Sequence, residues 1–236
     1  MFPYRVASPD RTGGREPHQL PPGRHGLSRS FVADNQRERI LAAVADVTSA
    51  ASYGEMTVED VIGVAGISRR TFYEHFKNKE EAFLAAYDAV VEQLFRNVVE
   101  AIERETTFAR RVSAGLGAFL DFLAREPAFA RMCLVEVMAA GPDAVARRNG
   151  AMSGFGNLIQ ENAAALLKPP LPPGVIAETI VGGVYEVVYS RVLRGEIRAL
   201  PELLPDLTVS MLLPYVGAEA ALAERGRLEN GAPASP

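Results

Sequence analysis

The sequence contains one cysteine, Cys133, among its 236 residues, and it contains no tryptophan. A single cysteine excludes an internal disulfide and any cysteine-rich zinc site, and it favours a reduced, cytoplasmic environment. No apolar run reaches the roughly 18 residues that a membrane span needs. The first 30 residues show no apolar segment typical of a secretory signal. We therefore expect neither a secreted nor an integral-membrane protein, and no membrane partner.

Residue types that support catalysis are also scarce. There are three histidines, and two of them, His18 and His25, lie near the N-terminus. The sequence has no G-x-S-x-G, H-E-x-x-H, C-x-x-C or P-loop motif. We therefore predict no enzyme activity, no metal site and no cofactor. The net charge of −4 gives no general indication of nucleic-acid binding, so any basic surface must be local.

The organisation of the chain follows from its composition. Residues 1–33 hold five prolines and four glycines without apolar periodicity, which predicts a disordered tail or an arm that touches DNA. Apolar residues then recur at helical spacing, and no run alternates as a strand does, so the predicted class is all-α. We expect a three-helix domain over residues 34–80, a helical domain over 81–223 and a frayed end over 224–236.

The most informative segment is 56–81, MTVEDVIGVAGISRRTFYEHFKNKEE. Its pattern predicts a helix over 58–65, a turn at Gly66, a second helix over 69–76 and the start of a long helix at Lys79. Gly54 is expected to end the preceding helix. Two short helices joined by a tight turn form a helix-turn-helix.

One face of the second short helix is polar and partly basic. Arginine can pair with guanine and a threonine methyl can meet a thymine methyl, whereas tyrosine and histidine suit phosphate oxygens. The residues on this face are Arg69, Arg70, Thr71, Tyr73 and His75. Alternatively, Tyr73 is a core aromatic, His75 is an ordinary surface residue, and Arg69 contacts phosphate rather than bases.

This segment resembles the DNA-binding domain of TetR-family transcriptional regulators. The matching units are Thr57-Val58, Ala65-Gly66-Ile67-Ser68, Thr71-Phe72-Tyr73-Glu74-His75-Phe76 and Asn78-Lys79-Glu80. Val61-Ile62-Gly63-Val64 departs from the Ile-Ala of many members. The resemblance implies that Thr57 and Lys79 hold phosphates, that Ser68 caps the recognition helix, and that Arg69, Arg70 and Thr71 face bases.

The resemblance further implies a homodimer on a palindromic operator, with repression relieved by a small molecule bound in the C-terminal domain. The apolar helices there predict a largely hydrophobic effector. The candidate ligand-binding residues are Phe119, Met132, Glu136, Tyr185 and Tyr189. The candidate dimer-interface residues are Val181, Val184, Val188, Leu207 and Met211. Alternatives are an activator, a ligand-independent regulator, or a helical interaction module that no longer binds DNA.

Overall fold

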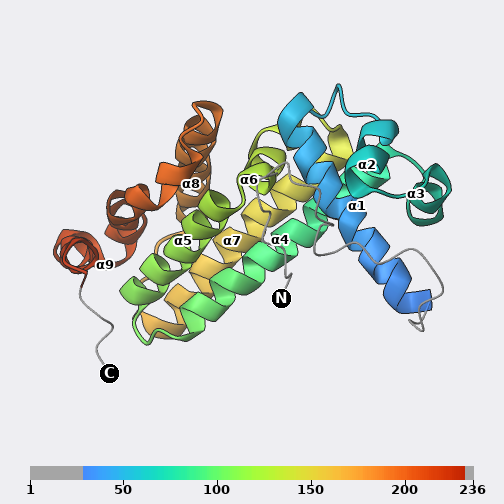
Figure 1. Cartoon of the computed structure of the whole chain (residues 1–236). Helices are drawn as coiled ribbons and strands as arrows, with labels where there is room; N and C mark the ends of the chain where they lie inside the picture. The colour runs from blue at the N-terminus through green and yellow to red at the C-terminus, as the bar shows by residue number, and fades with distance from the viewer. Residues whose placement is uncertain (1–28, 232–236) are drawn as a thin grey trace.

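The computed structural model describes residues 29–231, and within this range every regular element is a helix, as the all-α prediction requires. Figure 1 shows the long helix α1 and the short helices α2 and α3 gathered at one end of the molecule and α8 and α9 toward the other. The elements are α1 (Arg29–Ala51), α2 (Val58–Ala65), α3 (Arg69–His75), α4 (Lys79–Glu103), α5 (Phe108–Arg125), α6 (Pro127–Leu134), η1 (Glu136–Met138), α7 (Pro142–Leu166), α8 (Gly174–Leu193), η2 (Ile197–Leu203) and α9 (Leu204–Glu229).

The first core, here the N-terminal core, joins α1, α2, α3 and the start of α4. Ile40, Val61, Phe72 and Phe83 are almost completely buried within it. Each of these side chains comes from a different helix, so their common burial fixes the four helices against one another. Residues of α6 and η1 belong to the same core, which attaches the three-helix unit to the rest of the chain.

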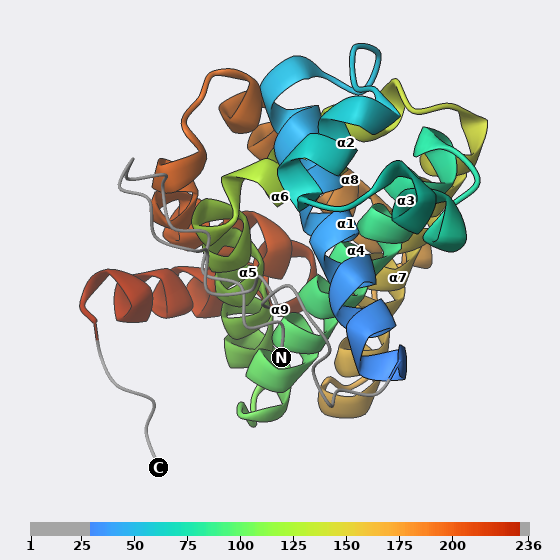
Figure 2. The ribbon, with the colours of Figure 1, turned by 45° about the vertical axis from the view of Figure 1, so that its right-hand side comes forward.

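The long helix α4 runs from this unit into a bundle with α5 and α7, and all three lie side by side in Figures 1 and 2. Its buried face continues past the N-terminal core through Leu94, Val98 and Ile102. One rigid helix therefore connects the two parts of the molecule.

Three predicted boundaries differ from the structure. Helix α1 begins at Arg29, inside the tail predicted for 1–33, while residues 1–28 lie outside the described part. It ends at Ala51, and Ser52, not Gly54, takes the positive φ of 81°. Helix α9 is interrupted at Gly217 (φ 77°, ψ 176°), and its second part continues to Glu229, beyond the predicted frayed end at 224. This part is held because Glu224 is buried and accepts a 2.6 Å hydrogen bond from Ser113.

Candidate functional site

Side chains at both ends fix the position of α2. Thr57 caps its N-terminus and forms a reciprocal capping box with Asp60: the Asp60 backbone N–H donates to Thr57 Oγ1 (3.2 Å), and the Thr57 N–H donates to Asp60 Oδ2 (3.0 Å). Hydrogen bonding from Thr57 also holds the pKa of Asp60 below its usual value. Gly66 ends the helix with φ 60° and ψ 42°, the left-handed conformation that glycine adopts without steric cost.

The adjoining helix α3 directs its aromatic residues in two directions. Phe72 and Phe76 are buried in the N-terminal core, as the sequence pattern predicts. Arg70 faces outward with 89% of its side chain exposed and pairs with Glu74 across one helical turn (2.9 Å). Tyr73 is 46% exposed, so the alternative that it is a core aromatic is wrong. The outer face of α3 is therefore free to meet a partner along its length.

The remaining polar residues of α3 have local partners. Ser68 caps the helix, as predicted: its Oγ accepts the Thr71 backbone N–H at 3.0 Å. Arg69 pairs with Glu59 on α2, and its guanidinium lies 5.7 Å from the centre of the Tyr73 ring. His75 is half-buried at the helix end, beside Phe76. The outer face of α3 thus combines two arginines with a threonine, a tyrosine and a histidine.

Lys79 has a role that the sequence did not predict. Its ammonium donates to the carbonyl oxygens of Met56 (2.9 Å), Tyr53 (3.2 Å) and Gly54 (3.4 Å), and it lies 4.9 Å from the centre of the Tyr53 ring. These three carbonyls belong to the loop between α1 and α2. Lys79 therefore fastens this loop to the start of α4, and its predicted phosphate contact stays a prediction.

Two cations of α1 also contact the helix-turn-helix. Arg39 donates to the carbonyl oxygen of Gly66 at 2.9 Å and also to that of Ala65, so it satisfies acceptors at the end of α2. Arg37 lies over the ring of Phe76, 5.5 Å from its centre. Nothing in the local pattern distinguishes these arginines from ordinary surface residues, so sequence reasoning missed them.

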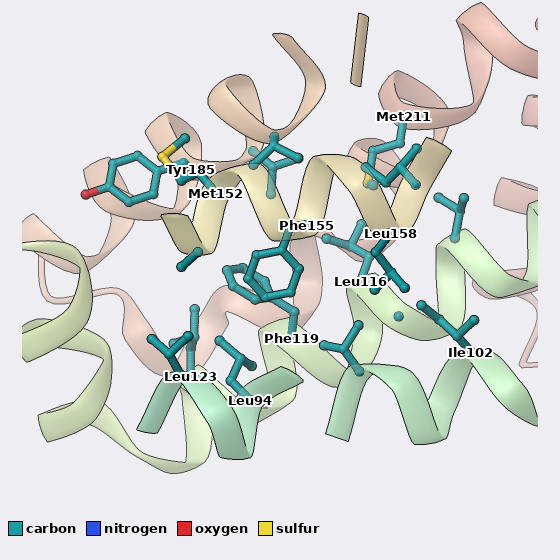
Figure 3. Close-up of a pocket in the computed structure, with 18 of the residues that line it drawn as sticks. Leu94, Ile102, Leu116, Phe119, Leu123, Met152, Phe155, Leu158, Tyr185 and Met211 are labelled. Atoms are coloured by element: carbon teal, nitrogen blue, oxygen red, sulfur yellow. The ribbon is translucent and has the colours of Figure 1, made fainter. Parts of the chain in front are cut away.

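The second feature is an elongated cavity of about 140 Å³ lined by residues of α4–α9. Figure 3 shows Met152 and Tyr185 at one end, Phe119 and Phe155 in the middle, and Ile102 with Met211 at the other end. Its lining is almost entirely aliphatic and aromatic. Such lining with a few polar groups is typical of sites for apolar small molecules.

Each end of the cavity has one arginine. Arg148 lies at the Tyr185 end, with its guanidinium carbon 4.1 Å from the centre of that ring. Arg111 lies at the Ile102 end, where it donates to Asn162 Oδ1 (2.8 Å) and to the carbonyl oxygen of Glu105 (2.9 Å). The sequence signal that could have identified this wall is the stripe of α7, in which Arg148, Met152, Phe155, Ile159 and Asn162 recur at helical spacing.

The predicted ligand-binding residues divide into two groups. Phe119 and Tyr185 line the cavity, whereas Met132, Glu136 and Tyr189 do not. Met132 is fully buried in the N-terminal core, and Tyr189 stacks on Tyr185 in a separate core formed by α5, α6, α8, η2 and α9. Met132 was predicted from an apolar helix face, and Glu136 and Tyr189 as polar groups beside such faces; neither signal distinguishes a cavity wall from a packed core.

Glu136 instead connects two parts of the chain. It is only 5% exposed, and its Oε2 accepts the backbone N–H of Tyr53 at 2.9 Å. Its Oε1 lies 3.5 Å from Arg131 Nε. The carboxylate of η1 therefore holds the same loop that Lys79 holds from α4.

The predicted dimer-interface residues face inward. Val188 and Leu207 are buried among helices of their own chain, so this part of the prediction is wrong. Val181, Val184 and Met211 line the cavity. The exposed apolar residues of α8 and α9 are Val175, Val187, Leu193, Leu213 and Leu222.

Burial keeps two groups at the Arg148 end of the cavity uncharged. It raises the pKa of the Cys133 thiol to about 12, and it raises the pKa of Tyr87 further above its usual value. Both residues line the cavity and also belong to the N-terminal core. Within the described residues, no helix is long and apolar enough to span a membrane.

Comparisons with known proteins support the helix-turn-helix interpretation. The family model described as "Bacterial regulatory proteins, tetR family" matches residues 40–86. Two curated relatives come from Mycolicibacterium smegmatis. The transcriptional activator FasR is 28% identical over 48% of this chain and 51% of its own length, and the transcriptional regulator EthR is 30% identical over 48% and 52%. The chain thus spans about half the length of these relatives.

Solved structures extend the likeness to most of the chain at the level of the fold. The fatty acid degradation regulator FadR from Bacillus halodurans has a TM-score of 0.68 at 18% identity, over 75% of this chain and 94% of its own. FadR from Bacillus subtilis, solved with stearoyl-CoA, has a TM-score of 0.65 at 20% identity, over 76% and 98%.

A capped helix-turn-helix joined by a long helix to an all-α bundle defines a class of bacterial regulatory protein. Residues 40–86 of this chain match the TetR family of bacterial regulatory proteins. The two relatives named above, FasR and EthR, are described as transcriptional regulators.

Proposed function

We propose that this protein is a sequence-specific DNA-binding transcriptional regulator that inserts α3 into the major groove. The observation that carries the proposal is the outer face of α3, where Arg70 and Tyr73 are exposed on a helix held by caps and by the N-terminal core. Arginine near the start of such a helix can pair bidentately with guanine. On DNA, the arginines of α3 exchange their carboxylate partners for base edges or phosphates.

The proposal includes a homodimer, because one α3 covers only half of a palindromic site. The outer faces of α8 and α9 support it: Val187 and Leu213 are exposed there. A Cβ built at Gly183 meets no atom within 4 Å, so a partner helix has room to approach. These residues replace Val188 and Leu207 as candidates for the interface.

The proposed effector is a largely hydrophobic small molecule in the cavity. Its effect on DNA binding is proposed to pass through α6 and η1, which lie between the two sites. Leu134 of α6 lines the cavity, and Glu136 two residues later holds the Tyr53 backbone. A ligand that binds the conformer unfit for DNA more tightly shifts the population away from DNA binding.

We propose repression released by the effector as the working mode, in the bacterial cytoplasm where the operator lies. Activation is the second candidate, and the specific observation in its favour is that the relative FasR is described as a transcriptional activator. The two modes are distinguished by transcription from the bound promoter in a strain with and without the gene.

The test of DNA binding measures the affinity of the purified protein for the intergenic DNA next to its gene, against scrambled DNA, at two salt concentrations. We expect preference for the native fragment that persists at the higher salt, because base contacts carry specificity and phosphate contacts carry salt dependence. Equal, salt-sensitive binding to both DNAs would contradict the proposal and favour the interaction-module alternative. Arg104→Met is a matched control for Arg70→Met, because Arg104 is an exposed arginine that pairs with a glutamate one turn away at the far end of α4.

A further inference from the structure

The polar side chains at the Ile102 end of the cavity bond to their own chain. Arg111 donates from Nε to the carbonyl oxygen of Glu105 (2.9 Å) and from Nη1 to Asn162 Oδ1 (2.8 Å). Asn162 donates in turn from Nδ2 to the carbonyl oxygen of Leu158 (2.8 Å). The surface that these residues add to the cavity is therefore nearly all carbon.

The polar side chains at the other end are engaged as well. The Tyr185 hydroxyl donates to the carbonyl oxygen of Leu134 (2.8 Å), and the Arg148 guanidinium lies over the Tyr185 ring. Arg148 Nη1 donates to Asn149 Oδ1 (2.9 Å), and its Nε is buried, out of reach of a ligand. Burial raises the pKa of Tyr87 above its usual value, so its hydroxyl stays uncharged. A polar group of a ligand loses its water here without gaining a partner, which lowers affinity by a factor of roughly ten to a hundred.

The volume of the cavity limits the size of the ligand. It is about 140 Å³. An apolar cavity of about 150 Å³ inside a protein stays dry and binds benzene. At the packing density of a protein interior, this space holds roughly 100 Å³ of ligand atoms. A single six-membered ring with a methyl group is of this size, whereas a long acyl chain is not.

The middle of the cavity is aromatic. Phe119 meets Phe155 edge to face, with ring centres 5.9 Å apart and an angle of 77° (Figure 3). Phe155 also stacks on Phe95 (4.1 Å, 12°), which is not part of the lining and so supports Phe155 from outside the cavity. Gly154 allows this stacking, because a Cβ there would lie 2.8 Å from Phe95 Cζ. A further aromatic ring extends such a cluster with a gain of a few-fold in affinity beyond its buried area.

We propose that the cavity binds an uncharged, single-ring aromatic hydrocarbon whose ring packs against Phe119 and Phe155. This inference rests on the proposed effector cavity and names its ligand class. The limit on size follows from the volume, and the absence of charge follows from a lining whose polar groups are turned to the protein. The preference for a ring follows from the aromatic cluster.

The experiment measures binding by isothermal titration calorimetry on the full chain without DNA. The parent probe is toluene. In phenol a hydroxyl replaces its methyl group, in benzoate a carboxylate replaces it, and in methylcyclohexane the ring is saturated. We expect toluene to bind at least tenfold more tightly than phenol or benzoate, because neither polar group finds a partner. In Phe119→Leu the affinity ratio of toluene to methylcyclohexane should fall about threefold.

A second variant tests whether toluene occupies this cavity. Ala151→Leu adds three carbon atoms to the lining and should weaken toluene binding at least tenfold. Ala146→Leu is the matched control, because Ala146 is exposed on the same helix, and it should leave the affinity unchanged.

Four outcomes overturn the proposal: no binding of toluene, phenol or benzoate binding as tightly as toluene, a toluene-to-methylcyclohexane ratio unchanged in Phe119→Leu, or toluene affinity retained in a folded Ala151→Leu variant. Should Ala151→Leu fail to fold, the probe series on the unaltered protein and on Phe119→Leu still decides. Because DNA is absent, failure of operator binding leaves this result intact, so the two proposals fail separately.

Discussion

Replacing Lys79 by methionine separates two roles for this residue. Methionine keeps much of the apolar stem but removes the ammonium that donates to the Tyr53, Gly54 and Met56 carbonyl oxygens. Of these bonds, the one to Met56 is the shortest, at 2.9 Å. A hydrogen bond to a charged group contributes about 1.5–3 kcal/mol. Because Lys79 is only half-buried, water can hydrogen-bond to the carbonyl oxygens that lose their donor, which offsets part of the lost stability. We therefore expect the free energy of unfolding to fall by about 2 kcal/mol.

The assay is urea unfolding followed by circular dichroism, with Lys77→Met as the control. Lys77 is exposed and two residues away, so its replacement removes the same charge without touching the loop. The Lys79 variant should lose about 2 kcal/mol at an unchanged m-value, equivalent to a melting temperature lower by roughly 4–8 °C for a domain of this size. The control should stay within about 0.5 kcal/mol of the unaltered protein.

Salt dependence of operator binding provides the decisive second readout. If Lys79 only fastens the loop, its removal leaves the slope of log K against log salt unchanged at temperatures where the variant is folded. If Lys79 contacts a phosphate, the slope becomes shallower by about 0.9. A Lys79→Met variant as stable as the Lys77 control, with a shallower slope, would refute the reasoning from the three carbonyls.

Four further predictions follow from single contacts. Arg70→Met should reduce operator preference by about 1–3 kcal/mol in a competition assay while leaving the melting temperature nearly unchanged; an unaltered preference would exclude a base contact. Gly66→Ala should cost about 1–2 kcal/mol in urea unfolding, because φ is 60° there; an alanine variant of equal stability would contradict this. Glu136→Gln should lower the free energy of unfolding by about 1–2 kcal/mol, since the Tyr53 N–H loses a charged acceptor. It should also weaken the release of DNA when effector is titrated in, and unaltered release would show that the coupling passes through other residues. Native stability should fall between about pH 9 and 12, because the unfolded chain releases the Cys133 proton from about pH 9, and Cys133→Ala should lessen that fall; an identical pH profile would assign it to other groups.

Sequence reasoning located the helix-turn-helix because its signals are local. The Thr57 and Ser68 caps, the Gly66 turn and the inward spacing of Phe72 and Phe76 depend only on residues a few positions apart. The same local signals predict the outward face of α3.

The cavity and the inter-domain contacts depend on residues far apart in the chain. Glu136 contacts Tyr53 across 83 positions, and no helical period reveals a carboxylate that turns toward another element. The interface prediction failed for a similar reason. Val188 and Leu207 belong to apolar helix faces, and an apolar face packs equally well against helices of its own chain or against a second copy. Lys79 follows a helix cap, where a phosphate contact and a carbonyl contact have the same sequence signature.

The sharing of Tyr87 and Cys133 between the cavity and the N-terminal core has a thermodynamic consequence. The side chains that the proposed ligand would contact at this wall also pack in the core that holds α1–α4 together. Coupling between ligand and DNA is reciprocal in free energy, so a small change in packing at this wall alters both affinities without touching either surface. If the proposed effector binds here, conservative replacements in this wall change the effector concentration needed for a response, while the residues proposed to contact DNA and ligand stay the same.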